Sequence, residues 1–150
     1  TSAPLQMALN DPTQTEAVAV SPTIALSQAT FCESVEAAHS NQSASAQVAA
    51  KLGIQTQPIR IDSQCKYATV ARGDASIYLR LPKQESYREK IWDHAAGMAL
   101  VEAAGGRVTD ITGASLDFTC GAQLDRNRGV VATCGNLHDE VLEAVQAIVT

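Results

Sequence analysis

Aromatic side chains, basic charge and long apolar runs are all scarce in this sequence of 150 residues. Phe, Trp and Tyr make up only 4% of residues although 45% are hydrophobic, so Ala, Val, Leu and Ile must build the core of one domain. Lys and Arg number 11 against 16 Asp and Glu, a net charge of −5 that argues against a nucleic-acid surface but allows a local phosphate pocket. No apolar run reaches the roughly 18 residues of a membrane span. No signal-peptide pattern is visible.

The cysteines also lack the spacings of a metal site or a disulfide framework. They are Cys32, Cys65, Cys120 and Cys134. None forms a CxxC pair, no histidine follows at zinc-finger spacing, and a disulfide framework would be unusual in a chain with this much core. The sequence therefore predicts four reduced thiols and an intracellular protein, with the cytoplasm as the expected compartment.

Residues 1–30 differ in composition from the remainder. They hold three of the five prolines and no Lys or Arg, and they are rich in Thr, Ser, Gln and Ala. We predict an irregular lead-in with one short strand over residues 17–20, taken from the interior of a longer fold. The sharper patterns begin at Phe31, so residues 31–150 are predicted to form one α/β domain.

From Phe31 onward, extended and helical patterns alternate, which favours an α/β architecture with helices packed on a sheet. Apolar alternation and a buried-type run predict strands over residues 58–61, 76–81, 107–110 and 129–133. An Ala-rich run predicts a helix over residues 43–52, and an expected N-cap predicts one over residues 64–71. Apolar residues at helical spacing predict helices over residues 91–104 and 138–149. The first three helices are followed by glycine, which commonly ends a helix.

The first candidate site is the segment Asp62-Ser63-Gln64-Cys65-Lys66. Asp62 and Ser63 occupy the expected N-cap of a helix. Ser63 and Lys66 are three residues apart and share a helix face, toward which the N-terminal N–H groups also point. This arrangement can hold a phosphate. The alternative is a capping serine beside a surface lysine, which the spacing alone favours.

Two further candidates are Asp93 and Arg80. Asp93 is expected in the first turn of the helix over residues 91–104, as a metal ligand or as a charge that stabilises the helix. His94 beside it is interpreted as an orienting or surface residue rather than as a ligand. Arg80 points away from Leu79 and Leu81 in its strand, so it either binds phosphate or is solvated.

Together these motifs resemble the C-terminal half of the fungal-type 3'(2'),5'-bisphosphate nucleotidase family, within the inositol monophosphatase superfamily. Two of the matching motifs are Asp-Ser-Gln-Cys-Lys-Tyr at residues 62–67 and Tyr-Arg-Glu-Lys-Ile-Trp-Asp-His-Ala-Ala-Gly at residues 87–97. The other matching segments, in order, are residues 31–36 with 39–40, 77–82, 102–106 and 116–118. The fold implied is a mixed sheet with packed helices, the C-terminal half of the inositol-monophosphatase-like sugar phosphatase fold.

The resemblance also implies residue roles and a reaction. Asp93 would be a ligand of a catalytic Mg²⁺, and His39, Ser63, Lys66, Arg80 and Asp93 would bind the nucleotide, with Lys66 and Arg80 at its phosphates. The family removes the 3'-phosphate of adenosine 3',5'-bisphosphate and gives AMP, which links it to sulfur assimilation. This is metal-assisted hydrolysis with electrostatic help from cationic side chains. Neither a nucleic acid nor a membrane is an expected partner.

One family motif, Asp-Pro-x-Asp-Gly-Thr, is missing, because the only Asp-Pro pair, Asp11-Pro12, precedes Thr-Gln-Thr. A single carboxylate does not hold catalytic magnesium by itself. We therefore expect no catalytic residue here beyond the metal ligand Asp93, an isolated chain with little or no activity, and an N-terminal half supplied in cis or in trans. The alternatives are a non-catalytic nucleotide- or partner-binding module and an inositol polyphosphate 1-phosphatase.

Overall fold

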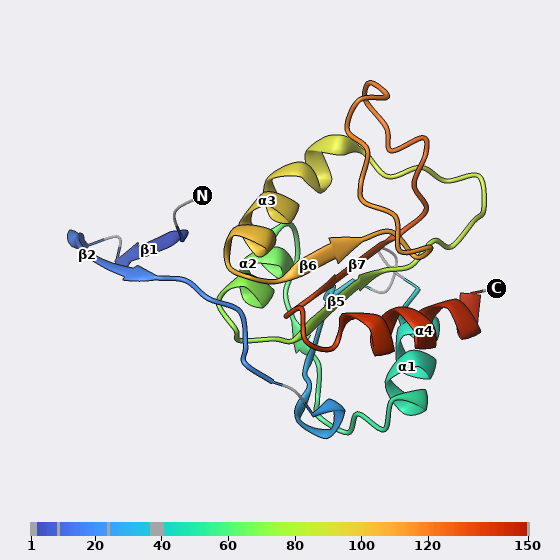
Figure 1. Ribbon diagram of the computed structural model, residues 1–150, viewed down its shortest axis with the longest axis horizontal. Coiled ribbons are helices and arrows are strands. Elements are labelled where there is room, and N and C mark those ends of the chain that lie inside the picture. The colour runs from blue at the N-terminus through green and yellow to red at the C-terminus, as the bar shows by residue number, and fades with distance from the viewer. Residues whose placement is uncertain (1–2, 9, 24, 37–40, 150) are drawn as a thin grey trace.

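A five-stranded mixed sheet forms the centre of the computed structural model (Figure 1). The structure describes residues 3–8, 10–23, 25–36 and 41–149. Strand β3 (Phe31–Glu33) runs parallel to its two neighbours, β4 (Ile59–Arg60) and β5 (Ile77–Arg80). Strand β7 (Val130–Thr133) lies antiparallel between β5 and β6 (Arg107–Thr109), which gives the order β4-β3-β5-β7-β6. The predicted class, α/β with a mixed sheet, is confirmed.

Two pairs of helices cover the two faces of this sheet. Helices α1 (Gln42–Lys51) and α4 (His138–Val149) contact each other on one face, and α2 (Cys65–Ala71) and α3 (Ala95–Ala103) contact each other on the opposite face (Figure 1). Each pair buries its own apolar cluster against the strands. The result is a three-layer arrangement in which the central strands have no solvent-facing side.

The side chains of β5 point alternately to the two faces of the sheet. Ile77 and Leu79 belong to the apolar cluster of α1 and α4, whereas Tyr78 belongs to that of α2 and α3. By the same period of two, Arg80 lies on the side of Tyr78, opposite to Leu79 and Leu81, as predicted. The strand therefore presents one cation toward α2 and α3.

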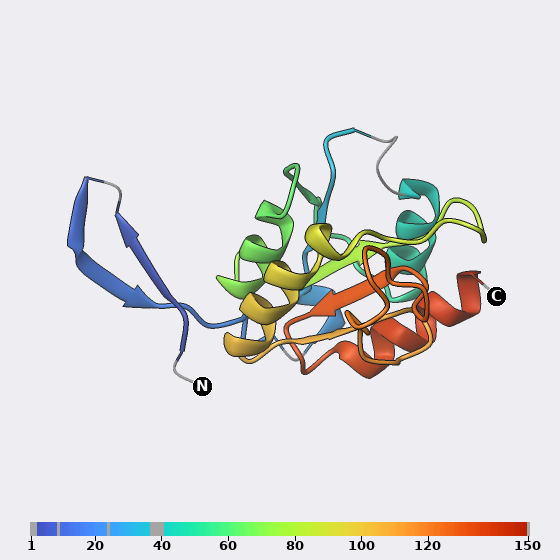
Figure 2. The same cartoon turned by 90° about the horizontal axis from the view of Figure 1, so that it is seen from above.

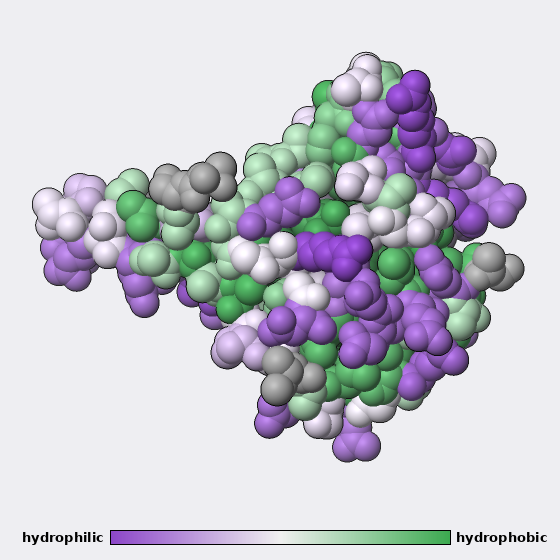
Figure 3. Space-filling view, in the orientation of Figure 1, coloured by the Kyte–Doolittle hydropathy of each residue, from purple (hydrophilic) through white to green (hydrophobic). Residues whose placement is uncertain are grey.

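The lead-in is not irregular as predicted, because it contains a β-hairpin. Strand β1 (Leu5–Ala8) pairs antiparallel with β2 (Asp11–Ala17), and the hairpin projects from the sheet and its helices (Figures 1 and 2). Pro12 is tolerated in β2 because this strand has a partner on one side only. The strand predicted over residues 17–20 is wrong except at Ala17. Apolar and hydrophilic surfaces alternate over the hairpin (Figure 3).

Two predicted helix starts are also corrected. Residues 91–104 divide into a 3₁₀ turn, η3 (Ile91–Asp93), and α3, so Asp93 precedes the α-helix. The N-cap of α2 is Gln64, and Ser63 instead adopts a φ of 59°. A short 3₁₀ turn, η1 (Leu26–Gln28), was not predicted.

The other predicted elements agree with the structure to within a few residues. They are the helices over residues 43–52 and 138–149 and the strands over residues 58–61, 76–81, 107–110 and 129–133. All four cysteines are free thiols. Within the described ranges, no helix combines the length and the hydropathy needed to cross a membrane.

Candidate functional site

A cleft of about 560 Å³ opens where the parallel strands end, on the face of α2 and α3. Ligands of open α/β sheets commonly bind beyond the carboxyl ends of such strands. Ten residues line the cleft: Ser34, Asp62, Ser63, Gln64, Lys66, Tyr67, Tyr78, Arg80, Asp93 and His94. Their side chains combine two cations, two carboxylates and several hydroxyl groups, which suits a polar, charged ligand.

Lys66 is the most deeply buried cation of the cleft, with only 5% of the residue exposed. Its Nζ lies 3.4 Å from the carbonyl oxygen of Ile61 and 5.6 Å from the centroid of the Tyr78 ring. Burial lowers the pKa of this ammonium from its ordinary value of 10.5 because the charged form loses hydration. A bound anion would restore the electrostatic stabilisation that burial removes.

The loop before α2 is tied to the end of β3. Asp62 accepts a hydrogen bond from the N–H of Val35 at 3.0 Å, and Ser63 Oγ accepts a long one from the N–H of Cys65 at 3.4 Å. The left-handed backbone at Ser63 turns the chain between β4 and α2. These contacts bring Ser63 to the wall of the cleft without making it the helix cap.

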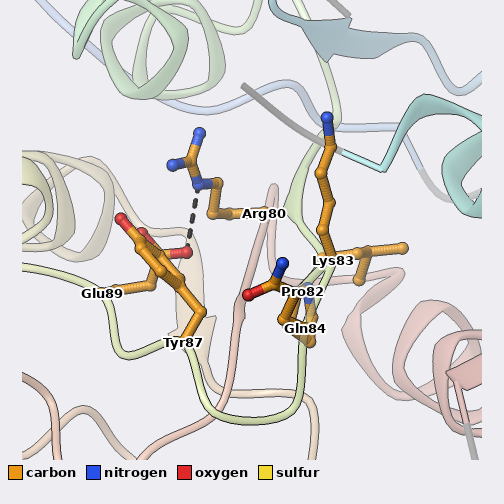
Figure 4. A pocket seen from close by; sticks show the side chains of 7 residues that line it. Arg80, Pro82, Lys83, Gln84, Tyr87 and Glu89 are labelled. Atoms are coloured by element: carbon orange, nitrogen blue, oxygen red, sulfur yellow. Dashed lines mark hydrogen bonds and ion pairs between the residues drawn. The ribbon is translucent and has the colours of Figure 1, made fainter. Parts of the chain in front are cut away.

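Arg80 lines both the main cleft and a second cavity of about 310 Å³, whose walls include Lys83, Gln84 and Tyr87 (Figure 4). Its Nε donates to Glu89 Oε1 at 3.1 Å, and the terminal nitrogens of the guanidinium lie away from that carboxylate (Figure 4). Glu89 is 4% exposed. The guanidinium is therefore held by a buried carboxylate from the segment that leads into η3.

Glu89 also joins a longer chain of hydrogen bonds. Its Oε2 lies 3.1 Å from His94 Nε2, and His94 Nδ1 lies 2.7 Å from the hydroxyl of Tyr67. Tyr67 packs edge-on against Tyr78, with ring centroids 5.0 Å apart. The chain therefore runs from Arg80 on β5, through two residues around η3, to helix α2.

The ionisation states in this chain follow from its surroundings. Burial raises the pKa of Glu89, but its hydrogen bond to His94 and the charge of Arg80 outweigh burial, and the pKa lies below 4.5. Burial, together with the nearby Tyr78 and Glu89, raises the pKa of Tyr67 well above 10. Tyr67 therefore keeps its proton and donates to Nδ1 of His94, whose Nε2–H donates to the charged Glu89.

Asp93 reaches the cleft from the 3₁₀ turn and is exposed. The turn is fixed to α2 because Gln64 Nε2 donates to the carbonyl oxygen of Trp92 at 2.8 Å. Carboxylate oxygen suits Mg²⁺, so Asp93 fits as one ligand. No three His, Cys, Asp or Glu side chains gather into a metal site among the described residues.

The cleft brings together four of the five residues predicted to bind substrate: Ser63, Lys66, Arg80 and Asp93. The fifth, His39, lies outside the described residues. Their roles in binding stay predictions. His94 is buried at the wall of the cleft and contacts Glu89, rather than lying on the surface, and its orienting role stays a prediction.

Sequence reasoning missed Ser34, Tyr67 and Glu89. Tyr67 and Glu89 belong to the two quoted motifs, and Ser34 belongs to the segment over residues 31–36. Their membership of these family-like segments was the sequence feature that could have identified them as site residues.

The comparisons with known proteins agree with this geometry. The chain belongs to the inositol monophosphatase family, whose sequence model matches residues 3–150. Curated relatives named 3'(2'),5'-bisphosphate nucleotidase include one from Emericella nidulans, 50% identical over 90% of this chain and 38% of its own length. Another, from Oryza sativa, is 53% identical over 79% of this chain and 33% of its own length. The chain thus spans about a third of the curated relatives it matches.

Solved structures show the same fold. The inositol monophosphatase of Thermotoga maritima aligns with a TM-score of 0.66 and 24% identity, over 89% of this chain and 46% of that one. The inositol monophosphatase from Anabaena aligns with a TM-score of 0.65 and 25% identity, over 88% of this chain and 48% of that one. The predicted resemblance to about half of this fold is confirmed.

Proposed function

We propose that this chain forms the substrate-binding part of a magnesium-dependent phosphatase that converts adenosine 3',5'-bisphosphate to AMP by removing its 3'-phosphate. The observation that carries the proposal is the convergence of Lys66, Arg80 and Asp93 on one cleft. The names of the similar curated proteins support the choice of substrate. In a cell, this reaction would serve sulfur assimilation in the cytoplasm.

Each residue of the cleft has a chemical task in this proposal. Lys66 and Arg80 bind phosphate oxygens through charge-assisted hydrogen bonds, the guanidinium in a fixed planar geometry. Ser63 donates its hydroxyl proton to the same ligand. Asp93 would hold Mg²⁺ together with ligands from outside this chain, and a metal bound there would supply neutralisation of phosphate charge and activation of water. The remaining ligands come from an N-terminal half in cis or in trans.

The intact mass of the native protein in its source cells tests that last point. An antibody raised against this segment would detect it. A species at about twice 15.8 kDa or more supports an N-terminal half on the same chain. A species at 15.8 kDa directs the search to a partner that supplies the metal ligands.

Turnover of adenosine 3',5'-bisphosphate by the native-length protein tests the activity. We expect Asp93→Ala to abolish turnover and Lys66→Ala mainly to raise KM, with the exposed Lys51→Ala as a matched control outside the cleft. Normal activity of Asp93→Ala would contradict the metal assignment. Binding without magnesium and without hydrolysis would favour the non-catalytic module, and faster turnover of an inositol polyphosphate would favour the 1-phosphatase.

A further inference from the structure

We infer that Glu89 is a positioning residue, which fixes the Arg80 guanidinium against the phosphate-binding cleft. This inference rests on the proposed function. The Glu89 carboxylate uses one oxygen for Arg80 Nε and the other for His94 Nε2, each at 3.1 Å. A carboxylate that is itself held at its second oxygen gives the Nε–H of the guanidinium a fixed acceptor, and this restricts the directions that the terminal nitrogens can take.

The other end of this chain of hydrogen bonds, at His94 and Tyr67, is held in place by packing. His94 is 2% exposed and Tyr67 is 1% exposed. A Cβ at Gly97 would overlap the Tyr67 ring, so α3 lies directly against that ring. Glu89 is consequently held by a closely packed interior rather than by a flexible loop. The position of Arg80 on β5 is thus coupled to α2, the helix that carries Lys66.

Kinetics of the native-length protein with adenosine 3',5'-bisphosphate test this role. We expect Glu89→Ala to raise KM about 10-fold with kcat changed less than about 3-fold, because oriented ground-state binding is lost. Glu89→Gln can still accept a hydrogen bond from Arg80, so it should raise KM by less than about 3-fold. If Glu89 acts through Arg80, adding Glu89→Ala to Arg80→Ala should change KM by less than about 2-fold.

Asp110→Asn is the matched control, since Asp110 is a buried carboxylate that lies outside the cleft and accepts bonds within its own turn. It should lower thermal stability without changing KM. An unchanged or lowered KM in Glu89→Ala, or independent effects in the double variant, would overturn the inference. If Glu89→Ala does not fold, Glu89→Gln and Tyr67→Phe carry the comparison, and an unchanged KM in both overturns it.

Binding of the nucleotide by the wild type, measured separately from hydrolysis, distinguishes a failure of this inference from a failure of the proposed function. If the wild type binds adenosine 3',5'-bisphosphate without hydrolysing it, the function fails, and the same variants are compared by Kd from calorimetry. A wild type that binds neither this nucleotide nor inorganic phosphate overturns both.

A different observation points to Ser34, and we propose that its hydroxyl is a further phosphate-binding group. Ser34 lines the cleft and is 1% exposed, yet its Oγ has no hydrogen-bond partner among the described residues. Buried hydroxyl groups are normally paired, because an unpaired one destabilises the fold. An unpaired hydroxyl at the wall of a charged cleft is explained by a ligand that pairs with it.

The placement of Ser34 indicates that its hydroxyl binds the same anion as Lys66. Ser34 directly follows Glu33, whose carbonyl oxygen accepts from the N–H of Ile61 at 3.0 Å. The Lys66 ammonium lies against the carbonyl oxygen of the same Ile61. Both residues therefore line the cleft where these two paired strands end. A phosphate oxygen there accepts from both.

Calorimetric binding and thermal unfolding of Ser34→Ala test this proposal. We expect Kd for adenosine 3',5'-bisphosphate to rise about 5-fold, and the melting temperature of the ligand-free protein to rise by a few degrees as the unpaired group is removed. Ser76→Ala is the matched control, because its buried Oγ accepts from the N–H of Thr30. That variant should lose stability and keep its Kd. An unchanged Kd in Ser34→Ala overturns the proposal, and so does a raised Kd with a lowered melting temperature, the signature of a structural hydroxyl.

Discussion

Among the described residues, two histidines are buried, one at the wall of the cleft and the other away from it. His94 is 2% exposed and His138 is not exposed at all. His94 accepts from the Tyr67 hydroxyl at Nδ1 and donates from Nε2 to Glu89, which binds Arg80. Its hydrogen bonds thus end on a charged pair beside the cleft.

His138 has the same tautomer, and both of its ring nitrogens contact uncharged hydroxyl groups. Thr133 Oγ1, which accepts from the N–H of Gly135, donates to Nδ1 at 2.9 Å. Nε2–H donates to Thr109 Oγ1 at 3.0 Å, and that hydroxyl donates to the carbonyl oxygen of Asp110. This chain of hydrogen bonds ends on a backbone group at each end, and it joins helix α4 to strands β6 and β7.

The difference shows that burial of a histidine does not identify its task. Both rings are satisfied at both nitrogens, so neither has a site left for a ligand. What differs is the group at the end of each chain of hydrogen bonds. For His94 it is Arg80, which lines the cleft, and for His138 it is a backbone group. Variants on the His94 side should therefore change binding, whereas those on the His138 side should change stability alone.

The largest expected effect is on the His94 side, from Gly97→Ala. The added methyl group would overlap the Tyr67 ring, and neither α3 nor the buried ring can move without opening the core. We expect a loss of more than about 3 kcal/mol in unfolding free energy, at the upper end for overpacking. Urea unfolding measures it, with the exposed Ala96→Ser on the same helix as the control. A loss below about 1 kcal/mol would contradict the tight anchoring of Tyr67.

The next effect concerns pH and His138. Burial, together with the nearby Arg107, lowers the pKa of His138 from 6.5 to about 4, partly opposed by Asp139. As pH falls below 6.5, the unfolded chain takes up a proton that the folded chain refuses. The contribution to stability is therefore complete above pH 6.5, declines down to pH 4 and is constant below it. We expect a loss of about 2–3 kcal/mol over that window.

Because carboxylates also titrate in that range, the measurement is a difference. Unfolding free energies of wild type and His138→Gln are compared between pH 7 and pH 4. The variant should lack the additional decline. Parallel curves would show that the folded protein binds the proton as readily as the unfolded chain.

The sequence predicted elements whose pattern is local and missed contacts made over long distances. An Ala-rich run and a glycine stop were sufficient for α1, and the buried apolar run for β7. The 3₁₀ turn at Asp93 was not predictable, because the preceding residues 89–91 are held by backbone bonds to residues 122–124. Motif membership led to Lys66 and Arg80, but the pairing of Arg80 with Glu89 exists only in the folded chain.

Two matched hydroxyl deletions sharpen the comparison of the histidines. Tyr67→Phe and Thr133→Val each remove the donor to Nδ1 of one histidine. Each should lower the unfolding free energy by about 1–2 kcal/mol, and Thr133→Val by more, because Gly135 also loses its acceptor. Binding of adenosine 3',5'-bisphosphate should weaken in Tyr67→Phe only. Equal weakening in Thr133→Val would remove the distinction between the two sides.

The smallest effect is expected at the surface above His138, where Asp139 binds Arg107 at 2.8 Å. The two side chains are 82% and 49% exposed, so water and salt screen the pair. Asp139→Asn should change the unfolding free energy by less than about 0.5 kcal/mol at pH 7. Since Asp139 raises the pKa of His138, its removal lowers that pKa further and extends the pH decline toward more acid values. Thermal unfolding at pH 7 and pH 4 measures both effects. A large loss at pH 7 would mean that the surface pair, rather than the two buried threonines, holds α4 against the sheet.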